Sequence, residues 1–294
     1  MSRLLPITAA QVAPVAWDVE ATYEKFEAEL GELKTAFSRT RLFVFPELYL
    51  SAIGAMADPT PPGYSASVAE PVPGPLTDRL CKIAEKLNVW LVPGSIYESD
   101  GGKDVYNTAV AISPTKGIVA KYRKVFPWRP WERTTAGDRF VVFDIDDVGR
   151  AGLMICYDGW FPEAARHLAW MGAEVILQPT ATGTSDREQE LVLARSNAIV
   201  NQVYVVNPNM GGRPGPGRSI IVDPEGHPLQ VAGDGEEYLT EVLDLDAVQR
   251  VREFGSVGLN RMWEQLRREG QAIDLPMYGG SFSAATSEPE HKRA

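Results

Sequence analysis

The middle of the chain reads Gly152-Leu153-Met154-Ile155-Cys156-Tyr157-Asp158-Gly159-Trp160-Phe161-Pro162-Glu163. Its apolar first part predicts a strand over Ala151–Cys156. Pro162 is a favoured first residue of a helix and Gly172 a favoured stop, so a helix is expected over Pro162–Met171. The stretch therefore predicts a strand, a turn and a helix, with Cys156 presented at the bend.

Short β-branched or aromatic runs alternate with helical stretches on both sides of this segment. We expect the other strands at Ile7–Val12, Leu42–Phe45, Val89–Ile96, Thr108–Ile112, Arg139–Asp144, Glu174–Gln178, Val203–Asn207 and Ser219–Val222. We expect the other helices at Val19–Phe37, Leu76–Leu87, Arg187–Asn201 and Asp246–Arg252. Turns such as Asp223-Pro224-Glu225-Gly226 join short strands as hairpins do. The mixture predicts a layered α/β protein.

The chain has 294 residues, of which 44% are hydrophobic and 23% charged, so it can bury a sizeable core. No repeat and no Pro/Gly linker divides it, and we expect a single domain over residues 1–280. Residues 281–294 are mostly polar and small, which predicts a mobile tail. Residues 246–280 carry Phe254, Leu259 and Trp263 among charges, a pattern that fits either an oligomerisation arm or packing on its own domain.

Charge and cysteine content exclude several classes of protein. With 29 Lys+Arg against 39 Asp+Glu, the net charge of −10 would repel phosphate backbones and anionic lipids. We therefore expect no nucleic acid or membrane partner, and we see no secretory signal. Two cysteines in so long a chain favour free thiols and a cytoplasmic location. The chain has no His-x-x-x-His or Cys-x-x-Cys pair, and we expect neither a metal nor a cofactor.

Cys156 is the candidate nucleophile. A strand end would hold its thiol rigidly, and the partial positive charge of the following helix N-terminus would favour the thiolate. The alternative is a buried, inert cysteine, the role that we assign to Cys81 on its amphipathic helix. His167, His227 and His291 do not lie in positions that suggest a partner base.

Two charged residues next to apolar or aromatic segments are candidates for the base and for the group that stabilises the oxyanion. Glu47 directly follows the apolar run Phe43-Val44-Phe45 and is a candidate base, although a loop charge or helix cap fits the same position. Lys124 leads into Val125-Phe126-Pro127-Trp128 and then Glu132. Such surroundings would make Lys124 a strong partner for a developing oxyanion, whereas most lysines near arginine are solvated surface charges.

Together these segments resemble the nitrilase, or carbon–nitrogen hydrolase, superfamily over nearly the whole chain. The resemblance rests on Phe45-Pro46-Glu47, Tyr122-Arg123-Lys124 and the segment from Gly152 to Glu163, with support from Ala10–Val15 and Ser219–Gly226. Lys124-Val125-Phe126-Pro127-Trp128-Arg129-Pro130-Trp131-Glu132 is similar to the pattern Lys-x-x-Pro-Trp-x-Pro-x-Glu of aliphatic amidases and formamidases. Two departures are Leu48, where those amidases carry tyrosine, and Gln178–Thr182, which replaces their Cys-Gln-Gly.

The resemblance implies a four-layer α-β-β-α sandwich (nitrilase-like), a homodimer or higher homo-oligomer, and hydrolysis of a small amide to a carboxylic acid and ammonia. It implies a Glu-Lys-Cys triad of Glu47, Lys124 and Cys156, with a Cys thioester intermediate and Glu132 as a supporting carboxylate. The backbone N–H of Tyr157 would join Lys124 in holding the oxyanion. The expected substrate-binding residues are Trp128, Tyr49, Trp160 and Thr180.

Two other functions remain open from the sequence. The same triad serves N-carbamoyl amine or amino acid hydrolases and nitrilases, and Arg187 or Arg195 would be candidates to contact a substrate carboxylate. A chain of a different class would keep this fold as a catalytically silent binding protein. Failure of Cys156 to react with a thiol-directed electrophile would favour that class.

Overall fold

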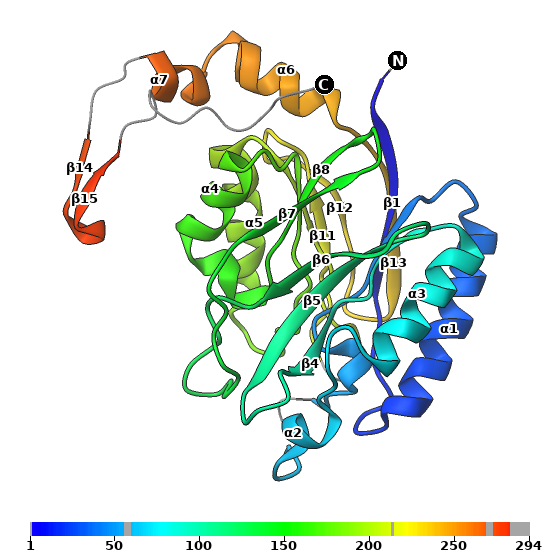
Figure 1. Ribbon diagram of the computed structural model, residues 1–294. Helices are drawn as coiled ribbons and strands as arrows, with labels where there is room; N and C mark the ends of the chain where they lie inside the picture. Colours follow the sequence, from blue (N-terminus) through cyan, green and yellow to red (C-terminus); the bar gives the residue numbers. More distant parts are fainter. Residues whose placement is uncertain (1, 56–59, 213–214, 269–272, 283–294) are drawn as a thin grey trace.

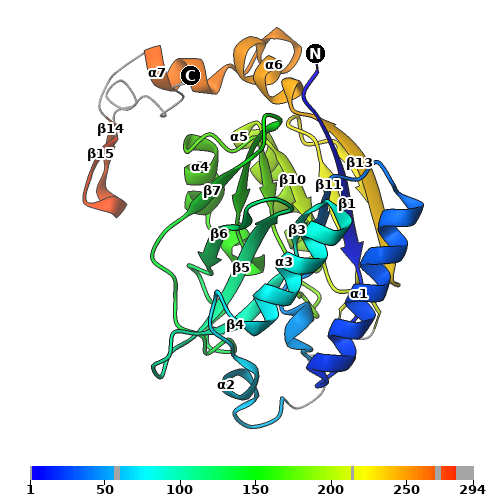
Figure 2. The same cartoon turned by 45° about the vertical axis from the view of Figure 1, so that its right-hand side comes forward.

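Two β-sheets pack face to face, with helices on both outer sides (Figure 1). The computed structural model describes residues 2–55, 60–212, 215–268 and 273–282. Helices α1 (Val19–Ala36) and α3 (Pro75–Leu87) cover one sheet, and α4 (Pro162–Trp170) and α5 (Arg187–Asn201) cover the other (Figure 2). This arrangement confirms the four-layer α-β-β-α sandwich.

The first sheet has seven strands within the described residues, in the order β13-β1-β2-β3-β5-β4, with β6 paired to β5. Their bounds are β13 (Glu237–Asp244), β1 (Leu4–Gln11), β2 (Leu42–Val44), β3 (Trp90–Val92), β5 (Val105–Ser113), β4 (Ser95–Ser99) and β6 (Gly117–Arg123). The N-terminal strand β1 therefore lies between β2, to which it is parallel, and the late strand β13.

The second sheet has six strands within the described part of the chain, in the order β12-β11-β10-β9-β8-β7. Their bounds are β12 (Pro228–Val231), β11 (Ile220–Val222), β10 (Tyr204–Asn207), β9 (Val175–Leu177), β8 (Gly149–Leu153) and β7 (Val141–Ile145). Because β8, β9 and β10 are parallel, the loops that follow them meet at one edge of the sheet.

Alternation along the strands divides the core into layers. In β2, Leu42 and Val44 pack between the two sheets, whereas Phe43 points to the side of α1 and α3. On α1, the side chain of Asp18 accepts a hydrogen bond from the N–H of Ala21 and starts the helix. The expected buried face of α1 packs onto this side of the sheet, with Tyr23, Phe26, Leu30 and Leu33.

The expected strand Val89–Ile96 is wrong, because the chain breaks between β3 and β4. Gly94 has a φ of 85°, and a Cβ built there would lie 1.8 Å from the carbonyl oxygen of Pro46. Only glycine fits this close approach. The break therefore brings the second strand past the residue that precedes Glu47.

Two strands of the first sheet were missed, and one other expected strand has the wrong end. The missed strands are β6 and β13, which pair with β5 and β1. The expected strand Ala151–Cys156 is too long: β8 ends at Leu153, and Cys156 begins the short 3-10 helix η2 (Cys156–Trp160). A short apolar run thus contains both a strand and the turn after it, which periodicity alone does not separate.

The C-terminal segments lie beyond the sandwich (Figure 1). Trp263 is buried, and its Nε1 donates to the carbonyl of Asn201 on α5, whereas Phe254 and Leu259 are exposed. Residues 283–294, nearly all of the expected tail, lie outside the described residues. The remaining elements are α2 (Tyr64–Val68), α6 (Asp246–Phe254), α7 (Met262–Arg268), β14 (Ile273–Leu275), β15 (Gly280–Phe282), η1 (Tyr49–Ser51), η3 (Ser256–Gly258) and η4 (Pro276–Tyr278). None of the described helices combines the length and apolarity that a bilayer crossing requires.

Candidate active site

Cys156 stands in a strained turn directly after β8. Its φ of 44° lies in the left-handed region, which costs energy for a residue with a side chain. The backbone is held there from both sides: its N–H donates to the carbonyl of Pro179 at 2.9 Å, and its carbonyl accepts from Gln178 Nε2 at 2.9 Å. The loop after β9 therefore fixes the direction of the thiol.

A buried ion-pair cluster lies beside Cys156 and joins three of the predicted residues. Lys124 Nζ lies 2.8 Å from Glu47 Oε1 and 2.8 Å from Glu132 Oε2. Asn107 on β5 donates to both carboxylates, at 2.8 Å to Glu47 and 2.9 Å to Glu132. The structure thus brings together charges that lie far apart in the sequence. Asn107 was missed, although an amide inside an apolar strand is a detectable signal.

The two carboxylates of the cluster keep the ammonium group of Lys124 charged. Burial alone would lower the pKa of Lys124, but Glu47 and Glu132 outweigh this effect and raise it well above its ordinary value. Burial alone would raise the pKa of Glu132, yet Lys124 lowers it. For Glu47 burial prevails over the attraction of Lys124, and the pKa is raised. One cation between two carboxylates therefore leaves Glu47 the stronger proton acceptor.

The helix N-terminus expected to favour the thiolate does not lower the pKa of Cys156 below its ordinary value. Burial raises the pKa of Cys156 well above its ordinary value, and the negative charge of Glu47 raises it further. Lys124 opposes both effects without reversing them. Desolvation and a neighbouring carboxylate outweigh a helix N-terminus that begins six residues later, at Pro162. The resting side chain is therefore a thiol that needs a base.

Asp158 fastens the cysteine turn to the lysine segment. Its Oδ1 accepts from the N–H of Phe126 at 2.9 Å. Its Oδ2 accepts from Tyr122 Oη at 2.7 Å and from the N–H of Ile155 at 2.8 Å. Two of these donors flank Lys124 in the sequence and the third precedes Cys156. This carboxylate, which sequence reasoning did not single out, holds the two segments in register.

Replacing Asp158 with asparagine is expected to destabilise the chain at pH 7 by about 1–3 kcal/mol, because the new NH₂ would face a donor. Burial raises the pKa of Asp158 to about 6, above its ordinary value, so the folded chain binds more protons than the unfolded chain between these two values. The contribution of this carboxyl to the free energy of unfolding is fully present below its ordinary pKa and is lost as the pH rises through about 6. Urea unfolding of the unmodified chain and of Asp158→Asn should therefore give a larger difference in the free energy of unfolding at pH 5 than at pH 7. Equal differences at the two pH values would contradict the assignment.

A narrow pocket opens over Cys156 and leaves about 30 Å³ of free space. Two predicted residues, Trp128 and Tyr157, line it. The others in the lining are Ala181, Thr182, Gly183, Thr184, Asp186 and Glu190. Only a small group fits beside the sulfur in this arrangement.

Three predicted substrate-binding residues lie elsewhere. Tyr49 is buried in the core on the α1 side, where it stacks on Phe45 and donates to Glu29 at 3.0 Å. Thr180 is buried and is not among the residues that line the pocket, and its hydroxyl accepts from Asn207 Nδ2 at 3.0 Å. Trp160 is half-buried next to Tyr157 and does not line the pocket. The turn at Leu48, with a φ of 53°, precedes Tyr49, which packs into the core on the α1 side of the first sheet.

The two arginines considered for a substrate carboxylate are already engaged. Arg187 is buried, pairs with Glu190 at 3.0 Å and donates to the carbonyl of Arg218. Arg195 donates to the carbonyl of Gly226 at 3.0 Å. Neither lines the pocket over Cys156.

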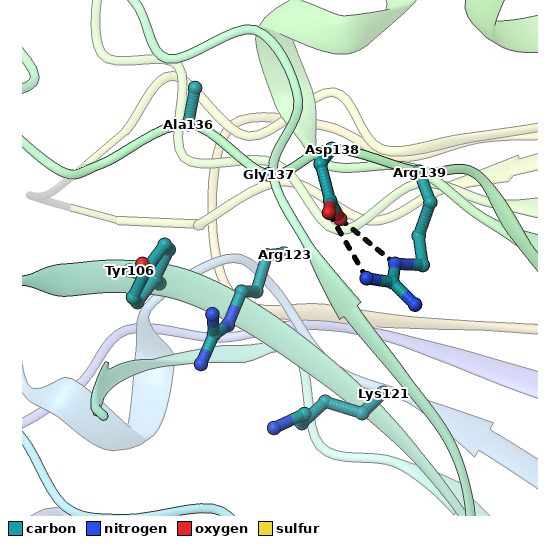
Figure 3. A pocket seen from close by; sticks show the side chains of 7 residues that line it. All are labelled: Tyr106, Lys121, Arg123, Ala136, Gly137, Asp138 and Arg139. Atoms are coloured by element: carbon teal, nitrogen blue, oxygen red, sulfur yellow. Dashed lines mark hydrogen bonds and ion pairs between the residues drawn. The ribbon is translucent and has the colours of Figure 1, made fainter. Parts of the chain in front are cut away.

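A second cavity of about 430 Å³ lies on the other face of β6 (Figure 3). Lys121 and Arg123 line it, whereas Tyr122 and Lys124 point to the opposite side. Both cations pair with the buried carboxylate of Glu98, at 2.9 and 2.7 Å. Arg139 forms an exposed pair with Asp138. Three cations against two carboxylates leave one net positive charge, and the lining holds no cysteine, serine, threonine or histidine. In the described part of the chain, His, Cys, Asp and Glu do not gather into a group that could hold a metal ion.

Comparison with known proteins gives consistent similarities. A family model described as carbon-nitrogen hydrolase matches residues 6–253. A formamidase from Bacillus cereus (strain G9842) is 31% identical over 199 residues, which cover 67% of this chain but only 58% of the formamidase. The solved structure of Saccharomyces cerevisiae Nit3, a member of branch 10 of the nitrilase superfamily, is 26% identical with a TM-score of 0.76, covering 85% of this chain and 93% of that chain.

A third similar protein shares the fold. It is a mutant of the amidase from Nesterenkonia sp. AN1 in complex with butyramide, 24% identical with a TM-score of 0.71. The match covers 86% of this chain and 95% of that chain. The sandwich described above is therefore common to all of these structures.

Proposed function

This chain belongs to the carbon–nitrogen hydrolase family, and we propose that it hydrolyses small amides to a carboxylic acid and ammonia. The observation that carries the proposal is Lys124, held 2.8 Å from both Glu47 and Glu132 beside Cys156. One relative is a formamidase and another binds butyramide, which supports small amides as the substrate class. The narrow pocket over Cys156 supports the same class.

Glu47 acts as the base in the first step. Its Oε1 accepts hydrogen bonds from Lys124 and Asn107, whereas Oε2 accepts none from the described residues. Oε2 takes the proton of Cys156 as the sulfur attacks the carbonyl carbon of the amide. A base is needed here because the resting cysteine is a thiol.

The negative charge that develops on the carbonyl oxygen is held by two donors. They are the charged Nζ of Lys124 and the backbone N–H of Tyr157, which follows Cys156 in the turn. Each aligned donor contributes about 3 kcal/mol to stabilising such a transition state. Glu132 keeps Lys124 in position through its ion pair.

Collapse of the tetrahedral intermediate completes the acylation. Glu47 returns the proton to the amide nitrogen, the carbon–nitrogen bond breaks, and ammonia leaves a thioester on Cys156. Glu47 then takes a proton from water, which attacks the thioester carbon. The carboxylic acid departs and the sulfur recovers its proton, so the cycle consumes one water and no other co-reactant.

An ammonia-release assay tests the substrate class. We expect release from formamide, acetamide, propionamide or butyramide, with rates that fall as the acyl chain outgrows the pocket. N-carbamoyl compounds and nitriles form the other arms of the panel. Turnover in one of those arms with silence on all amides would contradict the amide assignment and keep the triad. Silence in every arm would favour a binding protein without catalysis.

A further inference from the structure

A second buried carboxylate, Glu190, lines the pocket next to Cys156. Glu190 on α5 is 5% exposed, and its Oε1 lies 4.0 Å from Cys156 Sγ. Its Oε2 accepts from Thr182 Oγ1 at 2.6 Å and from Arg187 Nη1 at 3.0 Å. Within the described residues, Oε1 contacts no donor other than the thiol. One oxygen is thus anchored and the other is presented to the pocket.

The support around Glu190 fixes this orientation. Arg187 is itself buried, and its Nη2 donates to the carbonyl of Arg218 at 2.8 Å. Burial of a carboxylate is costly unless its oxygens are paired, and a purely structural ion pair would satisfy both of them. Oε1 has only the long contact from the thiol at 4.0 Å, which indicates a place where a ligand supplies a closer donor.

The distance to the sulfur defines where that donor must be. In an attack-ready complex the carbonyl carbon lies about 3–3.5 Å from the nucleophile. A group one or two atoms beyond this carbon is then within hydrogen-bonding reach of an oxygen 4.0 Å from the sulfur in the same pocket. Glu47 and Lys124, which act on the amide nitrogen and the oxyanion in the proposed reaction, do not line this pocket, whereas Glu190 does. Glu190 therefore faces the acyl part of the substrate.

We infer that Glu190 is a specificity-determining residue, which selects substrates with an N–H or O–H donor one or two atoms beyond the scissile carbonyl carbon. Two kinds of compound carry this chemistry: ureido compounds, with N–H attached to the carbonyl, and α-hydroxy amides. The inference rests on the proposed function only for the placement of the carbonyl next to Cys156.

Protection of Cys156 against iodoacetamide tests the inference through occupancy of the site, whether or not the compound is turned over. N-methylurea and propionamide have nearly the same shape, but the first carries N–H where the second carries CH₂. Glycolamide carries a hydroxyl where propionamide carries a methyl group. We expect half-protection at roughly ten- to a hundred-fold lower concentration of at least one donor compound than of propionamide.

Glu190→Gln is the sharpest variant, because it reverses the polarity of the presented atom. Arg187 and Thr182 both donate to the anchored position, so the amide oxygen of the glutamine must take it. The NH₂ group then faces the pocket as a donor, and the preference for donor compounds should disappear. Glu188→Gln on the same helix, with an exposed side chain, is the matched control and should keep the preference.

The outcomes separate this inference from the proposed function. Equal protection by all three compounds in the unmodified chain, or an unchanged preference in Glu190→Gln, would overturn the role of Glu190. A donor preference without ammonia release would support Glu190 and refute the hydrolysis. Labelling of Cys156 with single-site kinetics in Glu190→Gln would show that the variant keeps its pocket. A loss of the donor preference in that variant would then support the role of Glu190.

Discussion

A chain with Cys156 replaced by alanine should release no ammonia above the uncatalysed rate from any amide that the unmodified chain hydrolyses. Removal of the nucleophile eliminates the covalent route, and a loss of about 10⁶-fold in kcat is the order expected. Alanine leaves the turn intact, because the bonds from Pro179 and Gln178 are made to backbone atoms. The measurement is the ammonia-release rate of the purified variant at saturating substrate.

Cys81→Ala is the matched control for this loss. Cys81 is the other cysteine of the chain and lies on α3, which covers the outer face of the first sheet. Its replacement should leave kcat within about two-fold of the unmodified value, since a surface or helix substitution away from the site changes little. Hydrolysis that survives in Cys156→Ala and disappears in Cys81→Ala would contradict the assignment of the nucleophile.

Glu47→Gln should lower kcat by about 10³- to 10⁴-fold, at the upper end for the loss of a general base. Lys124 and Asn107 both donate to Oε1, so the amide oxygen of the glutamine is expected to take that position. Its NH₂ group would then occupy the place of Oε2, the oxygen that accepts the proton in the proposed mechanism. The variant keeps the size of the side chain but cannot accept the proton.

The pH dependence of kcat/KM in the unmodified chain tests the role of Glu47 as a base independently. Glu47 must be ionised to act as a base, so kcat/KM should fall as pH falls through the pKa of Glu47. Burial raises that pKa, and the acid limb should therefore lie at higher pH than for an ordinary glutamate. The acid limb should be absent from the residual activity of Glu47→Gln. A variant with activity within ten-fold of the unmodified chain would contradict the role of Glu47.

Strand ends made Glu47 and Cys156 candidates, an aromatic flank did so for Lys124, and the resemblance to the nitrilase superfamily assigned their roles together with Glu132. Glu47, Lys124 and Cys156 each follow an apolar or aromatic-flanked strand, and Glu132 follows Lys124 at the spacing of the amidase pattern. The structure places three of them in one ion-pair cluster beside the cysteine. These residues follow strands of both sheets, so the sequence signals gave the candidates and the packing of the two sheets brings them together.

Residues that act through partners distant in sequence could not be predicted in this way. Asn107 bridges two carboxylates that come from other segments, and Asp158 binds donors from both sides of Lys124. Glu190 reads as an ordinary acidic residue in the first turn of α5 until Arg187 and Thr182 are seen to hold it. The resting state of Cys156 also depends on burial and neighbouring charge, which the sequence does not display.

The most direct test of the thioester mechanism is the intact mass of the chain, quenched in acid within milliseconds of mixing with acetamide. Acid preserves a thioester, and a fraction of chains should be heavier by one acetyl group. Peptide mapping should place the added mass on Cys156, and the Cys156→Ala chain should show none. Ammonia released in the same interval with no acyl group on Cys156, or with the group on another residue, would contradict the central claim.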